Sequence, residues 1–345
     1  MNITQFDPKL DRASDTRDVS SFTFCHVLYS NASCPVPSNE EARHIEALCA
    51  ANAIVVDAIF SIALAFGLPG SVLTLITVSS LKSTPGTRYI ACLAASDFIS
   101  LTLASLAMYK IAAVDNLTEN EEVIMNISYS FHFFSNWSLA LICLERFVSV
   151  RFPMYKSQYY SNRATVLSVC IALGISFVPY CLEFVFKADR YLSASHKHVI
   201  FLITSVLVDS ILPGIFILIF SVRTALELKE KANHRKSLVS QCSNKNTSQA
   251  VMLETRLTKM MFLTVGCFVV LIFPASIRQT YNIVYFVMDD TYCTLETTRY
   301  MFSTRTLFAL TYLNNAVNFY VYMAFAQGFR KQCVRVICSK LTQAC

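Results

Sequence analysis

The sequence LERFVSVRFP, residues 144–153, ends a long apolar run with an acid and a base side by side. The acid is Glu145 and the base is Arg146. A charged pair at the edge of such a segment costs free energy to desolvate unless each charge is compensated, so residues of this kind usually have a function. The stretch therefore predicts a membrane-spanning helix with a functional ion pair at one end.

The composition is that of a membrane protein. Of the 345 residues, 54% are hydrophobic and 15% are charged, and the mean hydropathy is +0.46. Soluble domains have about 25% charged residues. The net charge of +6, with no basic face outside the segment ends, argues against nucleic-acid binding. No glycine-rich phosphate loop and no His-Glu-x-x-His motif is present, so an enzyme is not expected.

Apolar segments of about 20 residues, the length needed to cross a bilayer, recur along the chain. Their apolarity is continuous and does not alternate, which predicts helices and not the strands of a barrel. The expected fold is an all-α membrane protein, a bundle of seven transmembrane helices followed by a short amphipathic eighth helix. The predicted spans are residues 53–81, 87–111, 123–150, 164–186, 199–226, 257–287 and 300–326.

Basic residues in the short loops predict how the bundle is oriented. They gather on the side that holds Lys82 and Arg330, whereas the opposite loops are acidic. The amino terminus is therefore expected outside and the carboxy terminus in the cytoplasm, with no cleavable signal peptide apparent. We expect an extracellular segment (1–50), the bundle (51–326, with a cytoplasmic loop at 227–254) and a tail (327–345). Sequons for glycosylation on the outer side begin at Asn2, Asn31 and Asn116.

Cysteines on the predicted outer side can form disulfides, because that side is oxidising. These are Cys25, Cys34, Cys49 and Cys293. They allow three pairings, among which we favour Cys25 with Cys34 and Cys49 with Cys293. On the amphipathic stretch after the last span, Cys333 and Cys338 are candidates for palmitoylation or, equally, free thiols of the tail.

Several motifs, taken in order, resemble those of the rhodopsin-like (class A) G-protein-coupled receptors. Glu145-Arg146-Phe147, followed by a proline, resembles the Asp-Arg-Tyr motif that ends the third helix of that family. Asn318 and Tyr322 resemble its Asn-Pro-x-x-Tyr motif in the seventh helix. The resemblance covers nearly all of the membrane region. It implies an extracellular ligand, a heterotrimeric G protein and arrestin as partners.

The resemblance also implies a switch on the cytoplasmic side. In the family, an acid at the start of the sixth helix forms an ionic latch with the arginine at the position of Arg146, and Glu254 occupies that place here. Exchange of these partners, with outward movement of the sixth helix, would open a cleft for the G protein. The alternative is a static surface ion pair. The predicted switch residues are Glu145, Arg146, Glu254, Asn318, Tyr322 and Met154.

Members of the family bind sodium at an aspartate of the second helix. The matching positions are Asp97, Ser135, Asn314 and Asn318. A carboxylate with hydroxyl and amide oxygens suits a hard monovalent cation. A protonated Asp97, hydrogen-bonded to the same groups, is the alternative, and we favour the ion. No other cofactor is expected.

Polar residues toward the outer helix ends are expected to form the ligand pocket. Amine receptors carry an aspartate where this chain has Ser128, and opsins carry a lysine in the seventh span that is missing here, so amines and retinal are disfavoured. The Asn-Phe-x-x-Tyr variant and the Pro-Met-Tyr-Lys sequence after the third helix most resemble invertebrate neuropeptide receptors of the FMRFamide type. The predicted pocket residues are Lys110, Ser128, His132, Asp209, Arg278, Gln279, Tyr281, Arg305 and Tyr312.

The chain departs from the family pattern at several places. Phe319 replaces the proline of the seventh-helix motif, and Ile272 replaces the usual tryptophan of the sixth helix. Glu121 stands where the third helix normally carries a cysteine, and the second outer loop, residues 187–198, has no cysteine either. Both halves of the family's usual disulfide are therefore missing together.

Two other functions remain open. A chemosensory or orphan receptor of the same fold would share Arg146 and Glu254 but answer to small molecules. A cation or proton transporter would use Asp97 and Asp209 as an ion path, although seven spans offer no inverted repeat. For the receptor, we expect a multi-pass protein of the plasma membrane.

Overall fold

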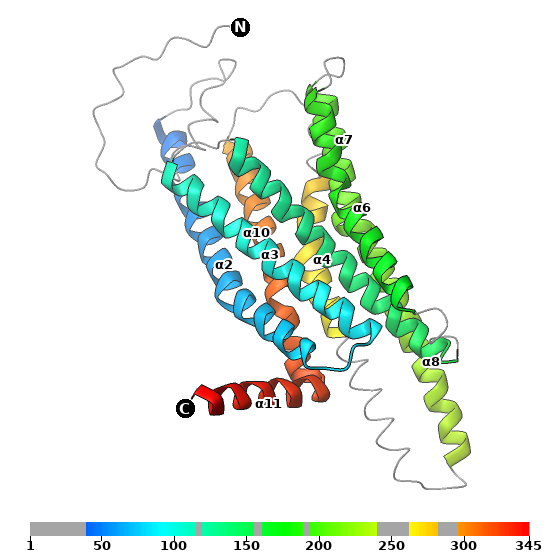
Figure 1. Ribbon diagram of the computed structural model, residues 1–345. Coiled ribbons are helices and arrows are strands. Elements are labelled where there is room, and N and C mark those ends of the chain that lie inside the picture. The colour runs from blue at the N-terminus through cyan, green and yellow to red at the C-terminus, as the bar shows by residue number, and fades with distance from the viewer. Residues whose placement is uncertain are drawn as a thin grey trace.

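The computed structural model describes residues 39–114, 119–154, 161–188, 194–239, 262–281 and 295–344, and this part of the chain is almost entirely helical. The long helices lie side by side in a bundle, and the last helix lies across one end of it (Figure 1). The all-α fold expected from the sequence is confirmed. The elements are α2 (Asn39–Ser79), α3 (Pro85–Val114), α4 (Glu119–Arg151), α6 (Asn162–Ala188), α7 (Ala194–Val206), η1 (Leu207–Ile211), α8 (Leu212–Val239), a helix over Phe262–Tyr281, α10 (Leu295–Phe325) and α11 (Gln327–Ala344).

Within the described residues, six helices are long and apolar enough to cross a membrane. The seventh predicted span is α10, which is less apolar because it contains charged residues near its start and several asparagines. Its asparagines at positions 314, 315 and 318 are buried against the other helices. α10 packs on α2 and α3, so its polar side faces the inside of the bundle.

Two helices extend beyond the spans predicted for them. α2 already begins at Asn39, inside the segment expected to precede the bundle. α8 continues to Val239, well into the predicted cytoplasmic loop, and protrudes from the end of the bundle in Figure 1. The added residues of α8 include Leu, Glu, Lys and Ala, which favour helix even without apolar neighbours. Hydropathy marks the apolar part of a helix and not its ends.

The fifth span is formed by α7, η1 and α8, with the π-helix η1 in its middle. The backbone N–H of Leu212 bonds to Leu207 O, five residues back, and so leaves Val208 O without its α-helical donor. Pro213 has no N–H, so Asp209 O loses its donor as well. Two buried carbonyls of this span must therefore find partners elsewhere.

α4 supplies both partners. Trp137 Nε1 donates to Val208 O at 3.0 Å. Asn136 Nδ2 donates to Asp209 O at 3.1 Å. The two side chains fix the π-helix against the third span, and this contact places the Asp209 side chain in the core.

Close packing between α2 and α10 accommodates the phenylalanine that replaces the family's proline. A Cβ at Gly70 would lie 3.0 Å from Phe319 Cβ, so a larger residue at position 70 would collide with it. The Phe319 ring also contacts Phe329 of α11, with centroids 6.2 Å apart. α11 packs its buried Phe329 and Cys333 against the bundle, whereas Val334 is exposed, so the eighth helix is amphipathic as expected.

Candidate functional site

The end of α4 carries the predicted ion pair. Arg146 Nε lies 3.4 Å from Glu145 Oε2, and the Arg146 side chain is 28% exposed whereas that of Glu145 is 2% exposed. Ser149 Oγ donates to Glu145 Oε1 at 3.0 Å. The carboxylate is thus anchored in the protein, while the guanidinium reaches toward the surface. Met154, just past the helix, is 87% exposed. Glu254, the predicted latch partner, lies outside the described residues.

A second contact at this end joins α4 to α8. Arg151 Nη1 lies 3.0 Å from Glu227 Oε2. Lys231 Nζ donates to Val150 O. The extended part of α8 supplies both partners, so its helical continuation beyond the apolar segment holds the third and fifth spans together.

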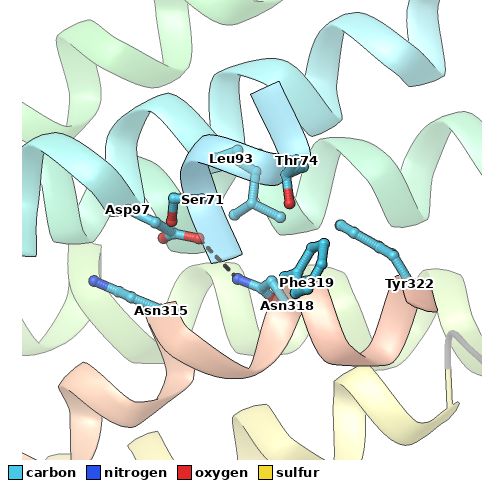
Figure 2. A pocket seen from close by; sticks show the side chains of 9 residues that line it. Ser71, Thr74, Leu93, Asp97, Asn315, Asn318, Phe319 and Tyr322 are labelled. Atoms are coloured by element: carbon cyan, nitrogen blue, oxygen red, sulfur yellow. Dashed lines mark hydrogen bonds between the residues drawn. The ribbon is translucent and has the colours of Figure 1, made fainter. Parts of the chain in front are cut away.

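Asp97 in α3 is fully buried and lies between α4 and α10. Ser135 Oγ donates to its Oδ1 at 2.5 Å. Asn318 Nδ2 donates to its Oδ2 at 3.0 Å, the contact drawn in Figure 2. The structure therefore brings together three of the four residues predicted to hold sodium.

The fourth predicted sodium residue is replaced by its neighbour. Asn314 is buried but does not line the cavity beside Asp97, whereas Asn315 does. Successive residues of a helix point about 100° apart, so only one of them can face Asp97. Ser71 and Thr74 of α2 line the same cavity. The prediction missed Ser71, Thr74 and Asn315. The adjacent amides Asn314 and Asn315 are visible in the sequence, but the sequence does not say which of them faces Asp97.

The cavity beside Asp97 offers oxygen atoms to a cation. The Asn315 amide oxygen and the Tyr322 hydroxyl are buried and have no hydrogen-bond partner within 3.5 Å in the described part of the chain. Buried polar atoms of this kind mark a place for water or an ion. Together with the Asp97 carboxylate and the Ser71 hydroxyl, they form a donor set that fits a hard monovalent cation.

A second buried polar cluster lies between α4 and η1. Asp209 Oδ1 accepts from Asn136 Nδ2 at 2.8 Å, and Asp209 Oδ2 accepts from Ser210 Oγ at 3.0 Å. His132 Nε2 lies 3.9 Å from Asp209 Oδ1. Both nitrogens of the His132 ring lack a hydrogen bond within 3.5 Å among the described residues. The cluster holds a carboxylate and an imidazole that can each accept a further polar partner.

Aromatic rings surround this cluster. Tyr312 of α10 lies 5.6 Å from the His132 ring between centroids, and its hydroxyl is a further buried group without a hydrogen bond within 3.5 Å in the described residues. Phe60 and Phe308 contact the Tyr312 ring edge-on at 5.3 and 5.9 Å. His132, Asp209 and Tyr312, three predicted pocket residues, thus belong to one deep polar cluster with apolar walls.

The other predicted pocket residues lie on three different helices. Arg278, Gln279 and Tyr281 lie at the end of the helix over Phe262–Tyr281, and the Arg278 guanidinium carbon lies 5.3 Å from the centre of the Tyr281 ring. Arg305 in α10 is exposed. Lys110 belongs to α3, but the structure does not describe its side chain. Arg305 interacts with Tyr129, whose ring contacts Phe308 at the wall of the deep cluster.

Ser128, a predicted pocket residue, also takes part in the packing of two helices. Its hydroxyl donates to Ser100 O at 2.8 Å, and Ser100 Oγ donates to Ser128 O at 3.0 Å. Both serines are fully buried. Ser128 therefore joins α4 to α3, and its side chain also faces Tyr312 of the deep cluster.

The predicted modification sites are only partly described. Cys49 is disulfide-bonded, and its partner lies outside the described residues, so the pairing with Cys293 stays a prediction. Cys333 is 1% exposed and packs in the core under α11, which does not favour its palmitoylation, whereas Cys338 is exposed. The sites outside the description are Asn2, Asn31, Asn116, Cys25, Cys34 and Cys293.

The chain was compared with known protein families. The model described as 7 transmembrane receptor (rhodopsin family) matches residues 70–322. The match covers well over half of the chain and runs from α2 to Tyr322 in α10. It includes the Glu145–Arg146 pair and the residues around Asp97.

Replacing Asn136 by alanine should destabilise the bundle. The change removes the donor to both the main-chain carbonyl and the carboxylate of Asp209, and leaving buried acceptors unpaired costs about 1–3 kcal/mol. Trp137→Phe is the matched control, because it removes a single donor, to Val208 O, and should cost less. Thermal unfolding of the purified protein in detergent measures both. An Asn136→Ala variant as stable as the parent would contradict the role given to this contact.

Proposed function

The chain belongs to the rhodopsin family of seven-transmembrane receptors, and we propose that within this family it is a receptor for a short extracellular peptide. Members of this family are receptors and not enzymes, and they bind extracellular ligands and signal through heterotrimeric G proteins. In the proposed mechanism, the ligand binds above the deep cluster around Asp209 and the sixth helix moves outward at the cytoplasmic end. The observation that carries the signalling part of the proposal is the Glu145–Arg146 pair at the end of α4.

The geometry of that pair suits a switch. Glu145 is buried and accepts a hydrogen bond from Ser149, a partner that does not depend on Arg146. Arg146 has one ion-pair distance of 3.4 Å to Glu145 in the described residues, and its side chain is partly exposed. Loss of this one contact costs less than breaking a fully buried pair, so two arrangements of Arg146 can lie close in free energy.

The α4–α8 contact supports the choice of the moving helix. The Arg151–Glu227 pair and the Lys231 bond to Val150 O hold the fifth span on the third at the end where the switch lies. The helix over Phe262–Tyr281 is not part of these contacts. Its outward movement would open a cleft beside Arg146 and the exposed Met154 without breaking the α4–α8 contact.

The proposal of a peptide ligand is supported by the spread of polar groups. Asp209 and His132 offer a carboxylate and an imidazole deep in the bundle, and Arg278 offers a guanidinium at the end of the sixth span. Aromatic rings around Tyr312 add apolar contact area. A short peptide carries cationic, hydrogen-bonding and aromatic groups on one molecule, which matches this combination. A small amine or odorant would contact only some of these groups.

The residues around Asp97 support a sodium ion as a second ligand. Asp97, Ser71, Asn315 and Tyr322 would hold it with their oxygen atoms, while Ser135 and Asn318 keep the Asp97 carboxylate in place, and the ion would supply the positive charge that a buried carboxylate requires. We also propose that the protein lies in the plasma membrane, crosses it seven times and has its amino terminus outside. The charge asymmetry of the loops supports this orientation.

Changes at the latch should alter signalling without ligand. Glu254→Ala should raise basal G-protein activation, because it removes the acid proposed to hold Arg146 in the resting state. Arg146→Leu should abolish activation, because the residue that meets the G protein is lost. Nucleotide exchange on purified G protein, normalised to surface expression, measures both. Unchanged basal exchange in Glu254→Ala would count against the latch, and full activity in Arg146→Leu would overturn the switch.

Sodium dependence should follow Asp97 and Asn315. Asp97→Asn removes the charge but keeps a hydrogen-bonding side chain, so ligand affinity should no longer change with sodium concentration. Asn315→Ala should weaken the sodium effect, and Asn314→Ala, the matched control on the same helix, should not. Ligand titrations in sodium and in a large organic cation give the comparison. An ion current that disappears in Asp97→Asn would instead indicate a transporter or channel.

The ligand class can be found with a panel of short peptides, in free and amidated form, on cells that carry a G-protein reporter. We expect an active peptide with a cationic group. Asp209→Asn should lower its potency about 10- to 100-fold, since a hydrogen bond to a charged group contributes about 1.5–3 kcal/mol. Activation by small odorants alone, with every peptide silent, would favour the chemosensory alternative.

A further inference from the structure

The first turn of α3 lies directly against the Glu145–Arg146 pair. Gly86 is the second residue of this helix. A Cβ placed on it would lie 3.3 Å from Glu145 Oε2 and 3.4 Å from Arg146 Nη2. Both members of the ion pair therefore rest on the bare backbone of Gly86.

The helix start itself does not need a glycine at this position. Gly86 has an ordinary helical conformation, and Pro85 before it is a residue that favours the first helical position. The helix is capped by two threonines: Thr87 Oγ1 accepts from Thr84 N at 2.8 Å, and Thr84 Oγ1 accepts from Thr87 N at 3.2 Å. What the glycine provides is space beside the ion pair.

We infer that Gly86 is a positioning residue for the switch: the missing side chain leaves the room in which Arg146 rests beside Glu145. This inference rests on the proposed function of Arg146. It assigns a role to the second span, which none of the predicted switch residues belongs to. A side chain at position 86 would shift the balance between the two arrangements of Arg146.

The direction of the shift follows from how the two charged groups are held. Glu145 is 2% exposed and bonded to Ser149, so its carboxylate has little freedom to move. Arg146 is 28% exposed and has a long, flexible side chain. A methyl group at position 86 would lie 3.3 Å from the carboxylate oxygen, which is slightly tight, and 3.4 Å from the guanidinium, at the edge of ordinary contact. Because the carboxylate is the less mobile of the two groups, the pair gains room when the guanidinium moves away. The resting arrangement is weakened, and the arrangement available to a G protein is populated more.

The experiment compares Gly86→Ala with Gly328→Ala. Gly328 is the second residue of α11, and a Cβ there has nothing within 4 Å, so the control changes glycine to alanine at the same helical position without a contact. Basal nucleotide exchange should rise roughly two- to five-fold in Gly86→Ala and stay at the parental level in Gly328→Ala, because a small change in the relative free energy of two states shifts their populations by such factors. Gly86→Val should have a larger effect.

A double variant separates positioning from a general effect on folding. In Glu145→Gln the charge of the partner is already lost, so adding Gly86→Ala should raise basal exchange little further. Equal effects of Gly86→Ala in the parent and in the Glu145→Gln variant would overturn the inference, as would a basal rate in Gly86→Ala at or below that of Gly328→Ala. If Gly86→Val does not reach the membrane, the alanine pair decides alone.

Failure of this inference is distinguishable from failure of the proposed function. If Arg146→Leu still activates the G protein, the switch itself is wrong. If Arg146→Leu is silent and Gly86→Ala behaves like its control, the switch stands and only the role of Gly86 is wrong.

Discussion

A polar group buried between transmembrane helices has no water to bind, so its partner must come from a neighbouring helix. In this protein α4 is that neighbour. Ser135 bonds to Asp97 of α3, Asn136 bonds to Asp209 of η1, and Arg146 lies beside Glu145 against the first turn of α3. Ser135 and Arg146 are eleven positions apart, about three turns, and lie on the side of α4 that faces α3, whereas Asn136 is turned about 100° from Ser135 and faces η1. α4 thus meets its neighbours with adjacent sides, and the bundle is arranged around it.

The sequence was sufficient for the architecture and for the clusters whose spacing is regular. Continuous apolarity located the spans, and the resemblance placed Ser135 and Asn318 beside Asp97, as the geometry shows. It was not sufficient where the answer depends on which way a side chain turns. The Ser128 hydroxyl donates to α3, and the cavity beside Asp97 is lined by Asn315 and not by Asn314. The π-helix and the close approach of Gly86 depend on contacts between distant segments, which no local pattern contains.

Departures from the family pattern are matched by other features of this chain. Phe319, in place of proline, packs on α2 where Gly70 leaves space.

The usual disulfide at the start of the third helix is missing, and within the described residues α4 is held to α6 in this region by other contacts. Asn126 Nδ2 donates to Glu183 Oε2 at 3.4 Å, and the Tyr129 and Tyr180 rings stack with centroids 6.1 Å apart. Side-chain contacts of this kind restrain the helix less rigidly than a covalent bond, which leaves the ligand end of α4 freer to move.

The freedom of α4 to move suggests how binding at its outer end can affect its cytoplasmic end. His132 and Arg146 lie on the same helix fourteen positions apart, a rise of about 21 Å at 1.5 Å per residue. Between them Ser135 is bonded to Asp97, so a rotation or shift of α4 changes the cavity beside Asp97 as well as the two ends. In the proposed mechanism, a ligand that pairs with Asp209 or His132 would change which contacts hold α4 against η1. One helix, α4, therefore connects the deep cluster physically to the Glu145–Arg146 pair, and it makes polar contacts near both of them and at Asp97 between them.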